Sequence, residues 1–399
     1  MKIVVTTSHQ YPVGTALTNR IRSYLEELAA LGHSVLVLIY RASEDSRNVQ
    51  NQASGELNGV RYRSTAHSVK KSKNPIIARF VRLYSYSNCV RILFQEERRE
   101  HIDIILQASA RSTIIPILWV VCRIIRAKYV LENSEYPWFY LKRRTSNIWE
   151  KPLYEKVYYR LFDGILAMTI ALQEYHSKYS KKTAKVFHLP MTVDMKRFNL
   201  GIERENLITY IGNVSYHKDG VGILVDSFIS IAQQHPDWKL MIIGDTSKDN
   251  DIIRKVREHG LENRVILKGA VHRDDVPELL CKSKILALAR PNGLQSEGGF
   301  PTKLGEYLAT GNLVVVTKVG DISRYLRDKE SAIIAEPNSV VSFSACLDHA
   351  IVNYETLTDV RLTGYEVCNR VFNSKLQGRY LEEYLTRLLD EIKTDSRSK

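Results

Sequence analysis

Paired cysteines and zinc-binding patterns are missing from this sequence. Five cysteines are scattered over 399 residues without a C-x-x-C pair, and the 11 histidines form no H-x-x-x-H pair. An odd, dispersed set of cysteines argues against a disulfide framework and favours reduced thiols in a cytoplasm. A zinc site is not expected, because its usual ligand spacing does not occur.

Long hydrophobic runs are missing too. No stretch of 18 or more uninterrupted apolar residues occurs, whereas a membrane-spanning helix needs about 20. The opening M-K-I-V-V-T-T lacks the long apolar region and small-residue cleavage site of a signal peptide. It is expected to form a first strand, and the protein is expected to be cytoplasmic. No G-x-G-x-x-G follows that strand, which argues against a dinucleotide-dependent oxidoreductase.

The charge is distributed unevenly. Residues 1–195 hold 29 Lys and Arg against 16 Asp and Glu, whereas residues 196–399 hold 28 of each kind. The first half therefore carries the whole net charge of +13. A one-sided basic field indicates an acidic partner. No nucleic-acid recognition motif accompanies it, so an anionic membrane face is the better fit and nucleic acid is not expected.

Short apolar strands alternate with amphipathic helices in two successive series. In the first, four apolar residues recur at helical spacing between residues 21 and 31, flanked by apolar runs at 2–7 and 34–40. Strand–helix–strand order of this kind gives a parallel sheet. A second series begins near Leu207. We predict an α/β fold of two Rossmann-like, doubly wound domains, 1–195 and 196–370, followed by a helix within 371–399 packing across both.

Two loops that follow predicted strands are candidate ligand sites. The first is S-H-Q-Y-P-V-G-T-A, in which Gly14 would let a ligand approach the backbone. The second is I-G-N-V-S-Y-H-K-D-G-V, in which Gly212 and Asn213 follow a strand and Lys218 precedes a helix. A helix N-terminus beside a lysine suits a phosphate. The alternatives are an ordinary turn for Gly14 and a solvated loop charge for Lys218.

A third stretch, S-E-G-G-F-P-T-K-L-G-E-Y-L-A-T-G, is the most specific. It follows a strand that ends at Arg290 and opens a helix, and its turn contains Gly299, Phe300, Pro301, Thr302 and Lys303. Backbone amides at such a helix start can bind a diphosphate. Glu306 can accept hydrogen bonds from the two hydroxyls of a ribose, and Glu297 can do so for a sugar. The alternative is that Glu306 only complements the helix dipole.

Taken together and in order, these segments resemble the retaining glycosyltransferases of family 4, of the kind that acts in bacterial polysaccharide synthesis. E-N-S-E-Y-P and L-P-M-T-V-D-M-K-R-F also look like segments of this family. The resemblance spans essentially the whole chain. It implies the GT-B fold, in which two Rossmann-like domains face each other across a cleft.

The resemblance also implies roles for particular residues. The second of two family acids, eight positions apart, binds the nucleotide ribose and corresponds to Glu306. The position of the first is Gly298, with Glu297 one place early. The family's diphosphate lysine corresponds to Lys218, but its arginine is replaced by Asn213. We expect Arg290 to compensate for that replacement.

Asp249-Asn250-Asp251 spells D-x-D, the metal–diphosphate signature of a different glycosyltransferase fold. It precedes a predicted helix here, and Asp or Asn as a helix cap explains it. The resemblance implies no metal requirement and no cofactor beyond the donor.

Two basic amphipathic stretches bear on membrane contact. In the first, apolar positions between residues 76 and 84 form a stripe flanked by Arg79, Arg82 and Arg91; the second is I-I-P-I-L-W-V-V-C-R-I-I-R-A-K. Basic amphipathic helices lie on anionic membranes. The alternative is a core-facing helix with a solvated basic face.

These expectations combine into one function. The enzyme should transfer a sugar, with retention, from a nucleoside diphosphate sugar to a hydroxyl of a saccharide or lipid-linked saccharide at the inner face of the membrane. Lys218 and Glu297, with Glu135 in E-N-S-E-Y-P, are the expected catalytic residues. A nucleotide-sugar epimerase of the same architecture and a non-catalytic GT-B partner subunit remain as alternatives.

Overall fold

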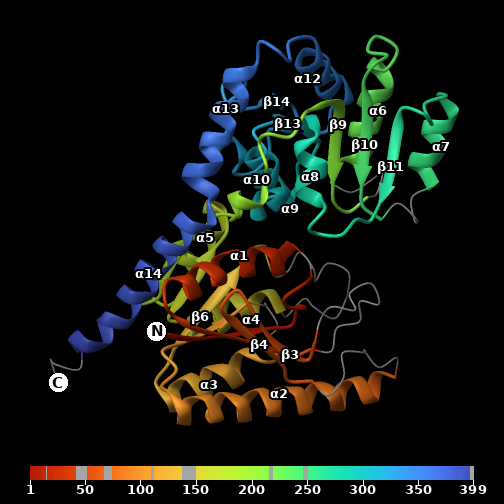
Figure 1. Cartoon of the computed structure of the whole chain (residues 1–399). Coiled ribbons are helices and arrows are strands. Elements are labelled where there is room, and N and C mark those ends of the chain that lie inside the picture. Colours follow the sequence, from red (N-terminus) through yellow and green to blue (C-terminus); the bar gives the residue numbers. More distant parts are fainter. Residues whose placement is uncertain are drawn as a thin grey trace. The chain divides into compact units, whose positions relative to one another are not determined.

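The computed structural model describes residues 1–14, 16–41, 52–66, 74–108, 112–136, 150–214, 219–245 and 250–395. Contacts divide the chain into two compact units, Met1–Thr192 with Ser374–Lys399, and Val193–Asn373. Each unit is built around its own sheet (Figure 1). The chain enters the second unit at Val193 and leaves it at Asn373. The sequence predicted these two boundaries at residues 195 and 370.

An eight-stranded sheet lies at the centre of the first unit, in the order β3-β4-β2-β1-β5-β6-β7-β8. Every neighbouring pair is parallel except β3 and β4. The strands are β1 (Lys2–Thr7), β2 (Ser34–Ile39), β3 (Ser54–Leu57), β4 (Val60–Ser64), β5 (Ile104–Gln107), β6 (Lys128–Asn133), β7 (Gly164–Ala167) and β8 (Lys185–His188). The predicted parallel, doubly wound sheet is confirmed.

The antiparallel β3–β4 hairpin was not predicted, although the sequence carries its signal. Its two-residue turn is Asn58-Gly59, and both residues have positive φ, 49° and 78°. Asn-Gly is the pair favoured by such tight hairpin turns, because both central positions require positive φ.

Helices cover both faces of this sheet. They are α1 (Ala16–Ala30), α2 (Pro75–Arg99), α3 (Ile115–Ile125), α4 (Glu150–Lys156), α5 (Ile170–Tyr179) and α14 (Ser374–Asp395). Alternate residues of a strand point to opposite faces: Val4 packs in the cluster lined by α2 and α3, and Ile3 in the cluster lined by α1 and α14. Coverage of both faces explains why β1 is buried along its whole length.

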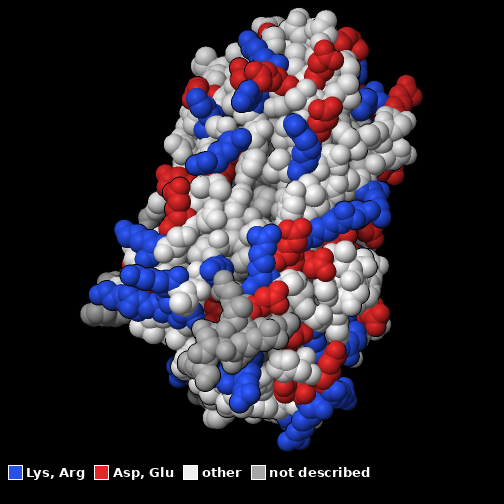
Figure 2. Space-filling model, turned by 90° about the vertical axis from the view of Figure 1, so that its left-hand side faces the viewer, with Lys and Arg blue, Asp and Glu red and all other residues white. Residues whose placement is uncertain are grey.

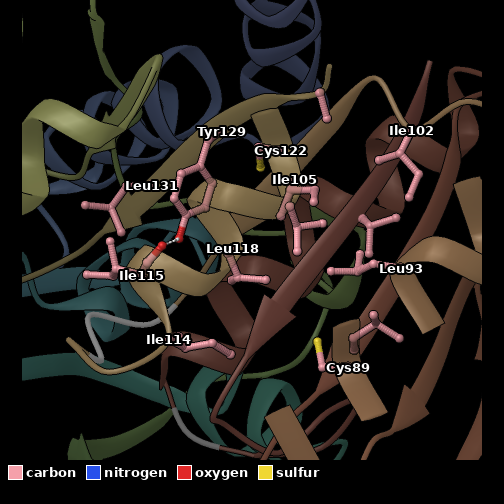
Figure 3. Packing of buried hydrophobic residues seen from close by; sticks show 14 of the residues in the cluster. Cys89, Leu93, Ile102, Ile105, Ile114, Ile115, Leu118, Cys122, Tyr129 and Leu131 are labelled. Carbon is pink, nitrogen blue, oxygen red and sulfur yellow. Dashed lines mark hydrogen bonds between the residues drawn. The ribbon is translucent and has the colours of Figure 1, made fainter. Parts of the chain in front are cut away.

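Figure 3 shows part of the cluster on the α2–α3 face. Cys89 and Cys122 lie within it, and all five cysteines of the chain are unpaired. Burial raises the pKa of the Cys89 thiol to about 12, so this side chain behaves as a small apolar group. The Tyr129 hydroxyl donates to the Gln107 side-chain oxygen, with the backbone oxygen of Ile115 3.4 Å away, so a hydroxyl inside the core is satisfied.

The C-terminal helix α14 belongs to the first unit. It packs along α1, and its Leu381, Leu385 and Leu388 are buried in the same core as the strands. Tyr384 donates a hydrogen bond to the backbone oxygen of Lys185 at 2.7 Å. The last segment of the chain therefore completes the domain that the first segment begins.

A core substitution tests this contribution of α14. Leu385 is fully buried, so Leu385→Ala should lower the free energy of unfolding by about 3 kcal/mol through lost transfer energy and a residual cavity. Urea unfolding is the measurement. Tyr380→Ala, at a 45% exposed position on the same helix, is the control and should have a much smaller effect. Equal effects would show that α14 is not part of the core.

The second unit holds a fully parallel six-stranded sheet in the order β11-β10-β9-β12-β13-β14. The strands are β9 (Glu205–Ile211), β10 (Lys239–Ile243), β11 (Val265–Gly269), β12 (Ser283–Leu288), β13 (Leu313–Thr317) and β14 (Ile333–Ala335). The helices are α6 (Val221–Ile231), α7 (Asn250–Glu258), α8 (Val276–Cys281), α9 (Leu294–Gly298), α10 (Thr302–Ala309), α11 (Ile322–Tyr325), α12 (Val340–Val352) and α13 (Thr358–Val367). A π-helical segment, Cys368–Phe372, follows α13.

The strand order of this sheet reverses at β9, which lies between β10 and β12. Ligands of open α/β sheets bind beyond the carboxyl ends of the strands, at such a reversal. The segments that follow β9 and β12 are therefore the expected place for a ligand, and they contain most of the predicted site residues.

Candidate active site

Three segments meet at the carboxyl edge of the second sheet. They are the end of β9 with Gly212, the start of α6 at Gly220, and the bend between β12 and α10. A Cβ on Gly212 would overlap the Lys303 ammonium, and one on Gly220 would overlap the Ala289 carbonyl. At Gly220 the obstacle is backbone, so glycine is required sterically. At Gly212 the obstacle is the end of a flexible side chain, and the φ of 151° is what favours glycine. The predicted residues around both positions are close neighbours in space.

Gly220 has a φ of 76°, and Gly260 has a φ of 65° with nothing near its missing Cβ. Gly260→Ala should cost about 1 kcal/mol of unfolding free energy, because only the backbone conformation is strained. Gly220→Ala should cost about 3 kcal/mol or more, because a backbone carbonyl must also move. Urea unfolding of the two variants measures the difference. Similar losses would mean that the contact between α6 and the end of β12 is not tight.

Lys303 lies on the first turn of α10, and its side chain is mostly buried against β9. Its Nζ donates a hydrogen bond to the Tyr210 hydroxyl at 2.9 Å and lies 4.4 Å from the centre of that ring. The Asp219 carboxylate is 3.7 Å from Nζ. Burial, aided by the charge of Arg290, lowers the pKa of Lys303 to about 8 although Asp219 opposes the shift.

Glu306 is one turn further along α10 and is half-buried. Its carboxylate accepts a hydrogen bond from Arg197 at 3.2 Å, and Arg197 also donates to the backbone oxygen of Arg273 at 3.1 Å. A structural arginine thus fixes the carboxylate predicted to bind ribose. Arg197 lies in the family-like segment L-P-M-T-V-D-M-K-R-F, but no role was predicted for it.

The bend before α10 contains a short helix, α9, that was not predicted. Ser296 closes its first turn, because its hydroxyl accepts from the Gly293 amide at 2.9 Å and donates to the Gly293 oxygen at 2.7 Å. Glu297 lies exposed on α9, whereas Gly298 is buried. The side chain beside the buried family position therefore points to the surface.

The remaining residues of the bend also have packing roles, besides being candidates for ligand binding. Phe300 is buried, with its ring 5.4 Å from that of Phe372. Pro301 precedes α10, and its side chain makes no capping hydrogen bond. It therefore does not occupy the first backbone amides of the helix, those of Thr302 and Lys303.

Arg290 holds α9 to the end of β12. Its Nη2 donates to the Gln295 oxygen at 2.7 Å, and its own backbone oxygen accepts from the Thr317 hydroxyl at 2.6 Å. Arg290 is almost completely buried. Its positive charge helps to lower the pKa of Lys303.

Asn213 directly follows Gly212 at the end of β9. Asn213 is exposed, and its backbone oxygen accepts a hydrogen bond from Tyr210 at 3.1 Å. Lys218 and Asp249 lie outside the described residues. Among the residues that are described, no group of three or more His, Cys, Asp and Glu is placed to hold a metal ion.

Glu135 and Gly14 belong to the first unit, where each follows a strand of the sheet. The Glu135 Oε2 atom is buried and, within the described part of the chain, has no hydrogen-bond partner. A buried carboxylate oxygen without a partner is costly. A Cβ on Gly14 would lie 3.0 Å from the Gln10 oxygen, so this turn is closely packed.

Part of the second unit matches a known protein family. A family described as "Glycosyl transferases group 1" matches residues 205–353, which include β9, α6, the bend and α10. The chain is therefore a glycosyltransferase, and its fold is GT-B. One component of phosphatidylinositol N-acetylglucosaminyltransferase from Arabidopsis thaliana is 23% identical over 85% of this chain and 72% of that protein.

Further relatives match a smaller part of this glycosyltransferase. Mannosylfructose-phosphate synthase from Agrobacterium fabrum is 24% identical over 48% of this chain and 45% of its own length. Among solved structures, Anabaena HepE in complex with UDP superposes with a TM-score of 0.70, at 15% identity, covering 97% of this chain and 100% of that one. A sucrose-phosphate synthase from Thermosynechococcus elongatus reaches a TM-score of 0.71 at 12% identity, covering 98% of this chain and 99% of that one.

Proposed function

We propose that this glycosyltransferase transfers a sugar, with retention of configuration, from a nucleoside diphosphate sugar to a hydroxyl of a saccharide or lipid-linked saccharide. The observation that carries the proposal is the geometry around α10. An uncapped helix start, a carboxylate fixed by Arg197 and a buried cation lie together at the reversal point of a parallel sheet. Anabaena HepE, which has the same fold, has been solved with UDP and with UDP-glucose.

The donor would bind in the second unit. Its diphosphate would lie at the backbone of Gly299 to Lys303, where the helix start favours negative charge. Lys218 would add a positive charge, and Glu306 would accept hydrogen bonds from the ribose. Stabilisation of the departing diphosphate by fixed charges and amides then supplies most of the catalysis. We propose that no metal is needed.

The first unit would bind the acceptor. Glu135 follows β6, and its buried Oε2 atom has no hydrogen-bond partner in the described part of the chain, so we propose that an acceptor hydroxyl supplies one. In a reaction with retention, a donor phosphate oxygen can take the proton of that hydroxyl. Glu135 would then orient the acceptor by hydrogen bonding, and few side chains need act as acid or base.

Donor binding is the first test. A thermal-shift screen of UDP-, GDP- and ADP-sugars should raise the unfolding temperature with one nucleotide class, because a ligand of the native state stabilises it by mass action. Glu306→Ala should reduce that shift strongly, since it removes the proposed ribose contact. Glu366→Ala, on α13 of the same unit, is the control. An unchanged shift in Glu306→Ala would refute the ribose assignment, and product formed from donor alone would indicate an epimerase.

The acceptor unit also has a surface suited to an anionic membrane. The first half of α2 exposes Ile76, Phe80 and Leu83 by 64%, 69% and 60%. Arg79 and Arg82 lie on the same turns and are partly or fully exposed. The second half of α2 is core-facing through Cys89 and Leu93, so only the first half supports the proposed membrane contact.

Charge alone does not define this surface. The face shown in Figure 2 carries several groups of Lys and Arg, with Asp and Glu among them. On α2, in contrast, basic and exposed apolar side chains occur together, and this combination favours the interface of an anionic bilayer. No helix in the described ranges is both long and apolar enough to span a membrane.

Vesicle sedimentation tests the contact. The protein should bind vesicles that contain phosphatidylglycerol at low salt, and it should be released as the salt concentration rises, because exposed charges are then screened. The double variant Phe80→Ser/Leu83→Ser should lose most of this binding. Val341→Ser, at a 79% exposed apolar position of the second unit, should retain it. Equal binding by both variants would exclude α2 as the contact.

A further inference from the structure

Lys303 occupies an unusual place for a lysine side chain. It reaches from the first turn of α10 across the end of β9, and its Nζ lies where a side chain on residue 212 would be. Only 17% of the side chain is exposed. Gly212 thus opens the space that the ammonium fills, at the strand end where the donor diphosphate is expected.

The groups that face this ammonium do not neutralise it well. Tyr210 of β9 accepts a hydrogen bond at 2.9 Å, and the Asp219 carboxylate at the start of α6 is 3.7 Å away. Arg290, at the end of β12, repels it. On α10 itself, Glu306 is engaged by Arg197 at 3.2 Å. The Tyr307 hydroxyl, also on α10, accepts from the Ile211 amide at 2.9 Å.

A mostly buried cation whose ion pair with Asp219 is long, at 3.7 Å, is costly for the folded protein. The pKa of Lys303, about 8, records this cost, and burial is its largest cause. Packing alone does not require the charge, since a methionine has a similar shape and no ammonium to desolvate. A ligand with more negative charge than Asp219 would offset the unfavourable burial of the Lys303 ammonium.

We propose that the Lys303 side chain binds the diphosphate of the donor, exchanging its contact with the Asp219 carboxylate for phosphate oxygens. This inference rests on the proposed function and adds a specific role to it. The site has no arginine at Asn213, and Lys303 supplies positive charge directly over the neighbouring Gly212.

Proton uptake should accompany binding. A diphosphate beside the ammonium raises the pKa of Lys303, because an opposite charge favours the protonated form. Near pH 8.5 much of the free protein has a neutral Lys303, so binding should take up as much as about one proton per site. The affinity should therefore be highest below pH 8 and should fall as the pH rises above about 8, where the free protein loses the Lys303 proton.

Isothermal titration with UDP, GDP and ADP measures both effects on the full chain. Titrations at pH 7.0 and 8.5, in buffers of different ionisation enthalpy, give the dissociation constant and the number of protons taken up. Lys303→Met should weaken binding by about 10- to 100-fold at pH 7.0, the loss expected for a charged hydrogen bond. It should also abolish most of the proton uptake at pH 8.5.

Lys282→Met is the matched control. Lys282 lies in the same unit, pairs with Glu278 at 2.6 Å and is exposed, so its loss should leave affinity and proton uptake unchanged. Circular dichroism and the thermal transition check that each variant folds. The wild-type proton uptake is an independent measurement that needs no variant.

The outcomes separate the two proposals. If the wild-type protein binds one nucleotide but shows no proton uptake at pH 8.5, or if folded Lys303→Met binds as tightly as wild type, the role of Lys303 is wrong and the proposed function stands. If the wild-type protein binds none of the three nucleotides, both are overturned. Binding with proton uptake that Lys303→Met loses supports the role.

Discussion

The donor-site architecture depends on the close approach of three backbone segments at one edge of the second sheet. The end of β9, the start of α6 and the bend before α10 meet where Gly212 and Gly220 leave no room for a side chain. Helix starts concentrate partial positive charge. A parallel sheet places its carboxyl ends on one edge, so backbone geometry alone creates a region suited to an anion. The Lys303 and Glu306 side chains lie within the positive electrostatic field of this backbone.

Placing these charged groups in a partly buried site is unfavourable, and hydrogen bonds from the surrounding structure offset this. Glu306 is fixed by Arg197, and Arg290 is held by the Gln295 oxygen, so two of the charged groups are positioned before any ligand arrives. Fixed charges need little reorganisation when a diphosphate departs, which is how preorganised sites accelerate group transfer. Lys303 is also held in place, by the Tyr210 hydroxyl at 2.9 Å, but its ion pair with Asp219 is longer, at 3.7 Å.

The two units differ in the groups they present. The second supplies the fixed charges expected at a donor site, whereas the first offers a buried carboxylate at Glu135 and an exposed apolar and basic half-helix in α2. In the proposed function, the second unit would hold the donor and the first unit the acceptor. Since α14 returns to the first core, that unit is built from both ends of the sequence.

The sequence by itself determined the local periodicity and the order of elements. Alternating apolar strands and amphipathic helices specified two parallel sheets, and the segment from Glu297 to Glu306 marked the family. Contacts between distant segments were decided only by tertiary structure. Neither Arg197 on Glu306, 109 positions away, nor Tyr210 beneath Lys303, 93 positions away, has a local signal. Hydrogen bonds between residues so far apart in the sequence form only when the sheet brings its strand ends together. The burial that results from this packing lowers the pKa of Lys303.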